Sequence, residues 1–378
     1  MPNLYLRTAA FSFILILAGT GAHGSEPLRP GFDITEYREL LKVFSSFAEG
    51  RSSVPASERF RRIHRSEEVG LDNQWELHVD DAGTAVISIR GTTKSMVSWM
   101  GNVYAAMAPA KGGLILGEGR TFEYQLAEDP QAAVHTGWLL GMAYLQEDIM
   151  PKLDSLTRCG GRDLLIMGHS QGGGIAYLLT AHLHHLMETG ALPEDLRIKT
   201  YCSAAPKPGN LYFAYELEHR TRGGWNFNVV NALDWVPEAP VSIQTMNDFN
   251  DSNPFVEGRS MMKRQPFFKR LVLKHMYGRL DKPTRKAQRR YERLLGRGVG
   301  KRIRKFLPNM EVSSYAQTTH YVRTGTTIVL MPDDDYMERF ARTDAKGIFL
   351  HHGIHQYLFL AERYDGRPDR SSEVGAVH

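Results

Sequence analysis

The feature that most constrains this 378-residue chain is the pentapeptide GHSQG at residues 168–172, because of what lies on either side of it. Four apolar residues, 164–167, precede it as a short buried strand, and apolar residues at helical spacing follow it from Ile175. Glycine has no Cβ, so strand and helix can approach closely and expose the Ser170 hydroxyl on a tight turn. The sequence therefore predicts a strand–turn–helix unit with Ser170 as a candidate nucleophile.

Other segments of the chain alternate between strand-like and helix-like patterns. The expected strands are 75–79, 84–89, 164–167, 198–203, 227–231 and 321–330, and the expected helices include 33–47, 138–149 and 175–187. This alternation predicts an α/β fold with a mostly parallel central sheet and helices on both faces. The composition, 42 % apolar and 23 % charged, is that of a globular protein and excludes a disordered or fibrous chain.

The first 24 residues are expected to form a signal peptide. Arg7 gives a positive start, and residues 9–18 form an apolar run too short for the ~20 residues of a spanning helix. Small residues then offer a cleavage site before Ser25, although an uncleaved anchor is the alternative. We thus expect a mature domain of residues 25–378, exported to the periplasm or secreted. There Cys159 and Cys202 either pair or remain separate thiols.

Positive charge is concentrated in an insert at about residues 242–319. Its segment 259–305 contains 18 Lys and Arg residues and two acidic residues, a net charge of +16, whereas the whole chain carries +4. Its apolar residues suit short basic amphipathic helices, which Pro266, Pro283 and Pro308 are expected to separate. The insert either packs on the body or binds an anionic membrane surface. No recognition motif for nucleic acid accompanies it, so nucleic acid is not an expected partner.

Further residues have the chemistry that an activated serine requires. A tetrahedral oxyanion needs hydrogen-bond donors, and the backbone N–H groups of Gln171 and of Thr92, which follows the strand 84–89, are candidates. Asp234 follows the strand 227–231, where a carboxylate can orient an imidazole. From residue types alone, Thr92 remains either an oxyanion residue or a turn-capping threonine. Asp234 remains either a triad acid or the aspartate of an Asx turn.

Several motifs in the right order resemble the class 3 lipases, the fungal-type triacylglycerol lipase family. They are IRGTT at 89–93, SW at 98–99, VHTGW at 134–138, GHSQG at 168–172, AAPKPGN at 204–210, VVN at 229–231 and DWVP at 234–237. The resemblance covers roughly residues 33–362 and is interrupted by the basic insert. It departs from the family pattern at Ala204, where glycine is usual. The N-terminal segment and the C-terminal pattern are typical of an exported bacterial member.

The resemblance implies an α/β-hydrolase fold and assigns roles to individual residues. It implies that Thr92 contributes to the oxyanion hole and that residues 94–107 act as a lid or lid hinge. Ser98 and Trp99 would be positioning residues there. His135 lies in a motif that is structural in the family, so it is not the expected base.

The base is expected near the C-terminus, where histidines stand at positions 351, 352 and 355. Many bacterial members have a histidine five residues before a tyrosine and an apolar helix. His352 stands five residues before Tyr357 and fits this pattern. His355 and His351 remain the alternatives.

We therefore expect a serine lipase that hydrolyses carboxylic esters of lipids through Ser170, Asp234 and His352, with no cofactor and no metal. The alternative is a phospholipase A1 that acts on anionic membranes, with the basic insert as its docking face. A less favoured alternative is a non-catalytic surface-adhesion protein on a lipase fold, which would require that the three residues fail to converge.

Overall fold

The computed structural model describes residues 26–48, 53–117, 119–250, 252–253, 266–340 and 347–364. The predicted signal peptide, residues 1–24, lies outside them. Among the described helices, none combines the length and the apolar character that crossing a bilayer requires.

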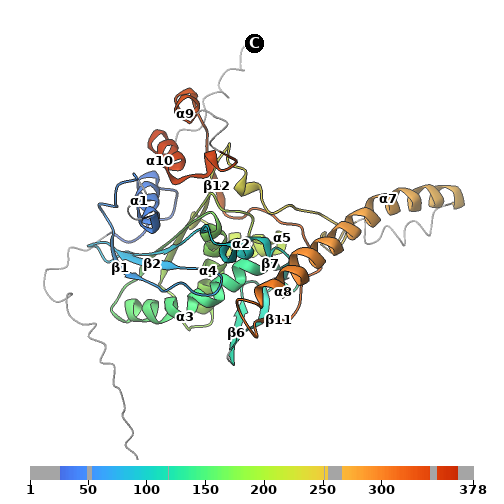
Figure 1. Cartoon of the computed structure of the whole chain (residues 1–378), viewed down its shortest axis with the longest axis horizontal. Helices are drawn as coiled ribbons and strands as arrows, with labels where there is room; N and C mark the ends of the chain where they lie inside the picture. The colour runs from blue at the N-terminus through green and yellow to red at the C-terminus, as the bar shows by residue number, and fades with distance from the viewer. Residues whose placement is uncertain are drawn as a thin grey trace, which may run out of the picture.

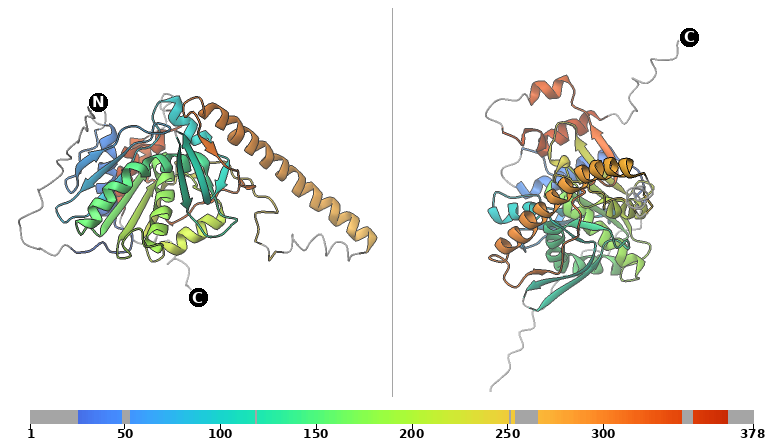
Figure 2. Two further views of the ribbon diagram at one scale, coloured as in Figure 1. Left: turned by 90° about the horizontal axis from the view of Figure 1, so that it is seen from below. Right: turned by 90° about the vertical axis from the view of Figure 1, so that its right-hand side faces the viewer.

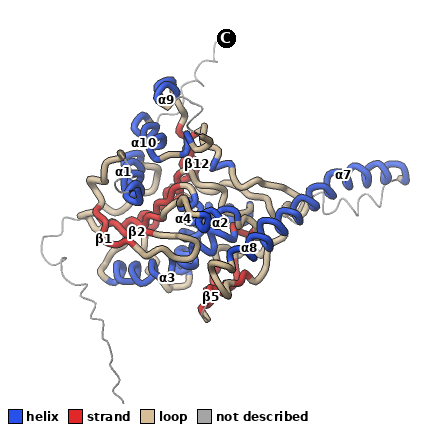
Figure 3. The backbone as a smooth tube through the Cα atoms, in the orientation of Figure 1, coloured by secondary structure: helices blue, strands red, loops and turns tan. Residues whose placement is uncertain are grey.

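A seven-stranded sheet forms the centre of the molecule, with the order β1-β2-β3-β8-β9-β10-β12. Its strands are β1 (Arg61–Arg65), β2 (Trp75–Val79), β3 (Ala85–Ile89), β8 (Asp163–His169), β9 (Arg197–Ser203), β10 (Asn226–Asn231) and β12 (Thr326–Leu330). The strands from β3 to β12 are parallel, and β1 and β2 pair antiparallel at one edge. Figure 3 shows these strands as the red centre of the fold.

The register brings the carboxyl ends of the parallel strands to one edge of the sheet. Ile89 is opposite Gly168, His169 is opposite Ser203, and Asn231 is opposite Leu330. Loops that leave these ends therefore meet at the same edge, where open α/β sheets bind their ligands. The chain segments that contain Thr92, Ser170 and Asp234 all leave the sheet there.

Helices cover both faces of the sheet (Figures 1 and 2). The helices α3 (Thr136–Arg158) and α4 (Gln171–Glu188) pack on each other in one core, and α1 (Ile34–Ser45) and α10 (Ile354–Arg363) pack together in the other. Other helices are α2 (Met96–Val103), α5 (Leu211–Arg220) and α9 (Asp334–Arg339). This arrangement of a mostly parallel sheet between helical layers, with a strand–turn–helix unit at Ser170, is an α/β-hydrolase fold.

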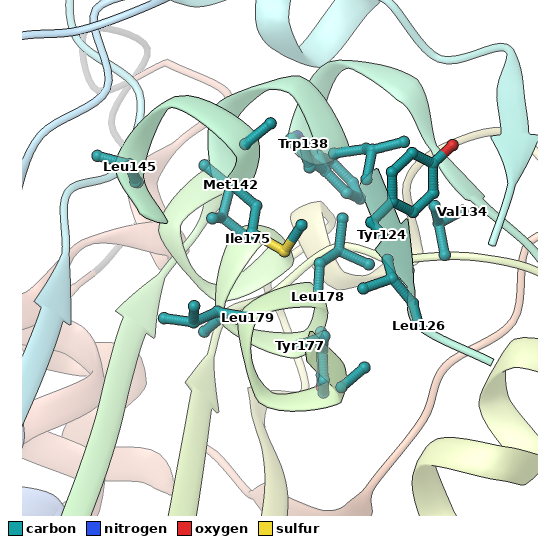
Figure 4. Close-up of a cluster of buried hydrophobic side chains, with 14 of the residues drawn as sticks. Tyr124, Leu126, Val134, Trp138, Met142, Leu145, Ile175, Tyr177, Leu178 and Leu179 are labelled. Atoms are coloured by element: carbon teal, nitrogen blue, oxygen red, sulfur yellow. The ribbon is translucent and has the colours of Figure 1, made fainter. Parts of the chain in front are cut away.

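The larger core lies between α3, α4 and the sheet. Trp138 and Met142 of α3 meet Ile175, Leu178 and Leu179 of α4 in this cluster (Figure 4). All five side chains are buried, and each contributes roughly 1.5–3 kcal/mol relative to an exposed position. The helix that begins directly after Ser170 is therefore held firmly on the sheet.

Two small antiparallel sheets lie beside the central one. The pair β4 (Met107–Pro109) and β7 (Ala133–His135) follows α2 and leads into α3. The strands β5 (Lys111–Gly117), β6 (Arg120–Gln125) and β11 (Glu311–Val312) form a three-stranded sheet. Because β11 lies within the basic insert and pairs with β5, this sheet connects the insert to the body.

The basic insert differs from the expected series of short helices. A single helix, α7 (Phe267–Glu292), continues through Pro283, followed by the π-helical turn η3 (Arg293–Gly298) and α8 (Val299–Ile303). Proline removes one hydrogen bond and disfavours a helix interior. Here Pro283 and the residue four positions before it, Arg279, are both exposed, so water can solvate the freed carbonyl. The prediction that Pro283 ends a helix was therefore wrong.

The last expected strand also begins later than predicted. β12 starts at Thr326 because Gly325, with φ of 81°, forms a turn immediately before it. Upstream, the Tyr321 hydroxyl donates to the Ala105 carbonyl at 2.7 Å, which holds that segment on the loop after α2. The cysteines do not form a disulfide, since Cys159 is an exposed free thiol and Cys202 is a buried one.

Candidate active site

Ser170 occupies a strained turn between β8 and α4. Its φ of 60° lies in the left-handed region, which residues with a side chain rarely adopt. A Cβ on Gly168 would lie 2.2 Å from the Gly172 carbonyl oxygen, and a Cβ on Gly172 would lie 2.1 Å from that of Ile89. Both glycines are therefore required for the close approach of strand and helix, as the pentapeptide predicted.

Asp234 and His352 form a direct pair, although 118 positions separate them in the chain. His352 Nδ1 lies 2.7 Å from Asp234 Oδ2. A carboxylate only accepts, so Nδ1 carries the proton and Nε2 keeps its lone pair. The Asp234 side chain is fully buried, whereas 14 % of the His352 side chain is exposed. An imidazole that a buried carboxylate orients is the arrangement that a general base requires.

Three donors surround the Asp234 carboxylate. Besides His352, the Tyr357 hydroxyl donates to Oδ2 at 2.8 Å, and the Val236 N–H donates to Oδ1 at 3.0 Å. The last bond is an Asx turn on Oδ1, whereas Oδ2 accepts from His352 and Tyr357. The Tyr357 hydroxyl also accepts from the Asn231 N–H at 3.0 Å, which connects α10 to the end of β10.

The two alternative histidines are engaged elsewhere. His355 Nε2 lies 3.1 Å from Ser53 Oγ in an exposed position. His351 Nδ1 lies 2.8 Å from the Tyr336 hydroxyl, and its carbonyl accepts from Asn231 Nδ2 at 3.0 Å. His352 is therefore the favoured base on geometry, in agreement with its spacing from Tyr357.

A buried chain of hydrogen bonds connects the serine turn to the base. His169 Nε2 donates to the His352 carbonyl at 2.8 Å, which brings the His352 backbone against the residue preceding Ser170. Burial, followed by the charge of a protonated His352, holds the pKa of His169 well below its usual value. His169 is thus neutral and its Nδ1 accepts from Ser203 Oγ at 3.0 Å, which leaves the Tyr37 hydroxyl to donate to Ser203 Oγ at 2.7 Å.

The oxyanion candidates lie beside this turn. A Cβ on Gly91 would lie 3.0 Å from the His169 carbonyl oxygen and 3.6 Å from Ser170 Cβ, so the residue before Thr92 abuts the turn. The Thr92 hydroxyl accepts from Asn102 Nδ2 at 2.8 Å, which fixes its side chain. Gln171 is the first residue of α4, and the first N–H groups of a helix have no partner within it.

Ser98 connects the oxyanion candidates through α2. Its hydroxyl accepts from the Thr93 N–H at 3.1 Å and donates to Gln171 Oε1 at 3.4 Å. Gln171 Nε2 in turn donates to the Ser98 carbonyl at 3.3 Å. Ser98 is fully buried. Its contacts join the loop after β3 to the first residue of α4.

Aromatic side chains from three segments form a cluster that reaches His352 through Phe349. The ring of Trp99 on α2 lies 6.0 Å from that of Phe349, which lies 5.4 Å from Trp235 and 5.9 Å from His352. On α2, Met96, Trp99 and Val103 are exposed. Met100 and Tyr104 are buried in the main core, so only part of the apolar set of residues 96–104 faces outward.

Other sequence-based expectations concern His135 and metals. His135 is buried, stacks on Trp138 at 3.7 Å and donates from Nε2 to the Asn102 carbonyl at 3.1 Å, so its contacts are structural. Burial lowers its pKa to about 3. Among the residues that the structure describes, no group of three His, Cys, Asp or Glu side chains is arranged to hold a metal ion.

The sequence did not identify the residues that hold the Asp234–His352 pair and the serine turn in place. Tyr357 entered only as a spacing marker, and Tyr37, His169 and Ser203 were not singled out. The spacing of Tyr357 from His352 was a usable signal, because it places a hydroxyl one helical turn after the base. Nothing in the local sequence connects Tyr37 to Ser203, since they are 166 positions apart.

Comparisons with known proteins find one family model and several solved structures that this chain resembles. The family model described as Lipase (class 3) matches residues 86–243. No curated protein matches the sequence. A fungal lipase–inhibitor complex is 20 % identical, with a TM-score of 0.43 over 56 % of this chain and 77 % of that one. The lipase of Rhizopus microsporus var. chinensis is 23 % identical, with a TM-score of 0.40 over 55 % of this chain and 69 % of that one.

Lipase II from Rhizopus niveus is similar to the same degree, with 22 % identity and a TM-score of 0.40 over 55 % of this chain and 74 % of that one. The residues that match the family model include Thr92, Ser170 and Asp234, whereas His352 lies beyond them. Over residues 86–243, the chain therefore matches the family model of the class 3 lipases.

Proposed function

We propose that the protein is a serine lipase that hydrolyses carboxylic esters of lipids, of the triacylglycerol type, through Ser170, Asp234 and His352. The observation that carries the proposal is the 2.7 Å contact between His352 Nδ1 and Asp234 Oδ2, held against the serine turn by the bond from His169 to the His352 carbonyl. These contacts join Asp234, His352 and the residue preceding Ser170 from separate parts of the chain, which supports a nucleophile–base–acid set at this place.

In the proposed mechanism, His352 Nε2 takes the Ser170 proton as Oγ attacks the ester carbonyl. The buried Asp234 carboxylate holds the tautomer and stabilises the imidazolium that forms. The N–H groups of Thr92 and Gln171 donate to the oxyanion, and His352 returns its proton to the leaving alcohol. Water activated by the same imidazole then cleaves the acyl-enzyme and releases the fatty acid. An oxyanion-hole donor is worth roughly 3–4 kcal/mol of barrier.

The surface around the serine turn supports a lipid substrate. Met96, Trp99 and Val103 on α2 are exposed, the exposed ring of Phe349 lies next to His352, and that of Trp235 lies next to Phe349. Exposed apolar side chains grouped at one site mark a surface that contacts apolar partners. A lid role for α2 fits this grouping, with Ser98 as its anchor and Trp99 as its lipid-facing residue.

A second candidate function is a phospholipase A1 that acts on anionic membranes. It uses the same triad, and the specific observation in its favour is the charge of +16 in residues 259–305. Added salt separates the two candidates, because screening weakens hydrolysis of an anionic phospholipid more than that of a neutral glyceride.

We also propose that the protein acts outside the cytoplasm, either in the periplasm or as a secreted enzyme. The support is the sequence of residues 1–24, with its positive start and short apolar run. Mass spectrometry of the N-terminus after expression with residues 1–24 tests this, and a chain that keeps them intact in the cytoplasm would refute it.

The hydrolysis itself is tested with p-nitrophenyl esters from butyrate to palmitate and with emulsified triacylglycerol, using the chain from Ser25 beside Ser170→Ala. We expect activity that increases with chain length and disappears in Ser170→Ala. Activity confined to butyrate would indicate a soluble esterase instead. A folded protein without activity on any ester would favour the non-catalytic alternative.

A further inference from the structure

The helix α7 forms an arm that projects from the body (Figures 1 and 2). Its C-terminal part is anchored, because Asp281 and Gln288 are buried and Arg285 Nη2 donates to Asn247 Oδ1 at 3.0 Å. In its N-terminal half, the described side chains of 267–276 are all exposed. We call residues 267–292 the basic arm.

Apolar side chains form a ridge along the exposed half of the basic arm. Four of them recur at intervals of four residues, which lie on one side of a helix. They are Phe268, Val272, Met276 and Leu280, with exposed fractions of 79 %, 57 %, 58 % and 61 %. Phe267 and Leu271 beside them are exposed as well. An apolar ridge of this size is costly in water unless another surface covers it.

The charges on the basic arm show what kind of surface can cover the ridge. The arm contains nine Lys and Arg residues and two acidic residues. In the described part of the chain, Asp281 pairs with Arg285, and Glu292 pairs with Arg297 outside the arm. The other eight cationic side chains have no acidic partner there. A second copy of the arm would carry the same charge and repel this one.

A basic cavity of about 530 Å³ lies at the base of the arm. Six cationic residues and Glu292 line it together with Asn247, Gln288 and Gln317. The six are Arg285, Lys286, Arg289, Arg290, Arg293 and Arg297. Guanidinium groups gathered around a concave site suit a phosphate group, which they bind through two parallel hydrogen bonds.

We infer that the basic arm docks the protein on a membrane that exposes anionic phospholipid. The ridge enters the boundary between headgroups and acyl chains, and the basic cavity takes a phosphate headgroup. The arm continues through η3 into α8, which packs against α2, and the Ala106 N–H donates to the Leu295 carbonyl at 3.3 Å. Docking would therefore bring a lipid surface to the neighbourhood of α2. The inference does not depend on the hydrolysis proposed above.

Sedimentation with vesicles tests this docking. The chain from Ser25 carries Ser170→Ala throughout, so that no lipid is consumed and a failure of the proposed catalysis cannot affect the result. We expect binding to vesicles of phosphatidylcholine with phosphatidylglycerol, little binding to phosphatidylcholine alone, and loss of binding near 1 M salt, where the Debye length is about 3 Å.

Two sets of substitutions separate the contribution of the cationic residues to binding from that of the apolar ridge. The cavity variant is Arg289→Gln/Arg290→Gln/Arg293→Gln, and the ridge variant is Phe268→Ser/Val272→Ser/Met276→Ser. Each cationic residue near an anionic membrane strengthens binding about fivefold. The cavity variant removes three of them, so it should bind about 100-fold more weakly. We expect about a tenfold loss for the ridge variant. All substituted side chains are exposed, so melting temperatures should not change.

The matched control removes the same charge outside the basic arm, through Arg29→Gln/Arg158→Gln/Arg222→Gln at exposed positions. It should bind within about twofold of the parent. Equal losses in the control and cavity variants would overturn the inference, because net charge alone would then explain binding. Equal binding to both kinds of vesicle, or a dimer in light scattering that the ridge variant abolishes, would overturn it as well.

Discussion

At the scale of single residues, the orientation of His352 depends on the groups that hold Asp234. The carboxylate accepts from His352, Tyr357 and the Val236 N–H, and it is buried. A buried charged acceptor is stabilised by such donors, and each is worth roughly 1.5–3 kcal/mol. Tyr357 is therefore a positioning residue, since it touches the acid and not the reacting atoms.

Tyr357→Phe tests this role. The substitution removes a donor to Asp234 and leaves the buried Asn231 N–H without its acceptor. We expect unfolding in urea to require about 1–3 kcal/mol less free energy. Because the imidazole is held less firmly, kcat on p-nitrophenyl butyrate should fall about tenfold with little change in KM. A variant with wild-type kcat but the same loss of stability would limit Tyr357 to a structural role.

The sequence pointed to the candidate reacting residues more readily than to the residues that support them. Ser170 and Asp234 each stand beside a strand with a recognisable local pattern, and His352 has a spacing pattern. Tyr37 and Ser203 have none, because their contact exists only after α1 packs under β9. Local sequence patterns predict local structure, so they do not reveal contacts between residues that are far apart in the chain.

At the scale of elements, the serine turn depends on the close contact of β8, α4 and β3. The strand–turn–helix unit was predictable because the glycines, the apolar run and the helical spacing all indicate the same local structure. The continuous helix α7 was not, because an exposed proline is tolerated where water can replace the missing hydrogen bond.

Gly172→Ala tests the close contact directly. The new Cβ would lie 2.1 Å from the Ile89 carbonyl oxygen, so the backbone must move. We expect a loss of about 3 kcal/mol or more in the free energy of unfolding and at least about 100-fold in kcat/KM. The matched control is Gly278→Ala on α7, where the nearest atom is Lys282 Cε at 3.9 Å. It should leave kcat/KM unchanged, and a similar loss in both variants would contradict the account.

At the scale of the whole molecule, buried neutral histidines make stability depend on pH. Burial lowers the pKa of His135 to about 3 and of His182 to about 4, and it holds that of His169 well below its usual value. The unfolded chain binds these protons near pH 6.5, whereas the folded chain does not. The contribution of these histidines to the free energy of unfolding is therefore fully present above about pH 6.5 and is lost as the pH falls below that value.

Urea unfolding at pH 7.5 and pH 5 measures this loss. Each buried histidine should contribute about 2 kcal/mol to the decrease. In His182→Leu the decrease should be smaller by about that amount, because one proton fewer is taken up on unfolding. Equal free energies of unfolding at the two pH values would show that these histidines are not held neutral in the fold.

The most direct measurement of the proposed triad is covalent labelling of the chain from Ser25 with an alkyl fluorophosphonate, followed by peptide mass spectrometry. The account predicts one adduct, on Ser170, formed at least about 1,000-fold more slowly in His352→Ala and in Asp234→Asn. His355→Ala, which removes an exposed ring bonded to Ser53, should label at the parent rate. An adduct on another residue, or undiminished labelling of Ser170 in His352→Ala, would contradict it.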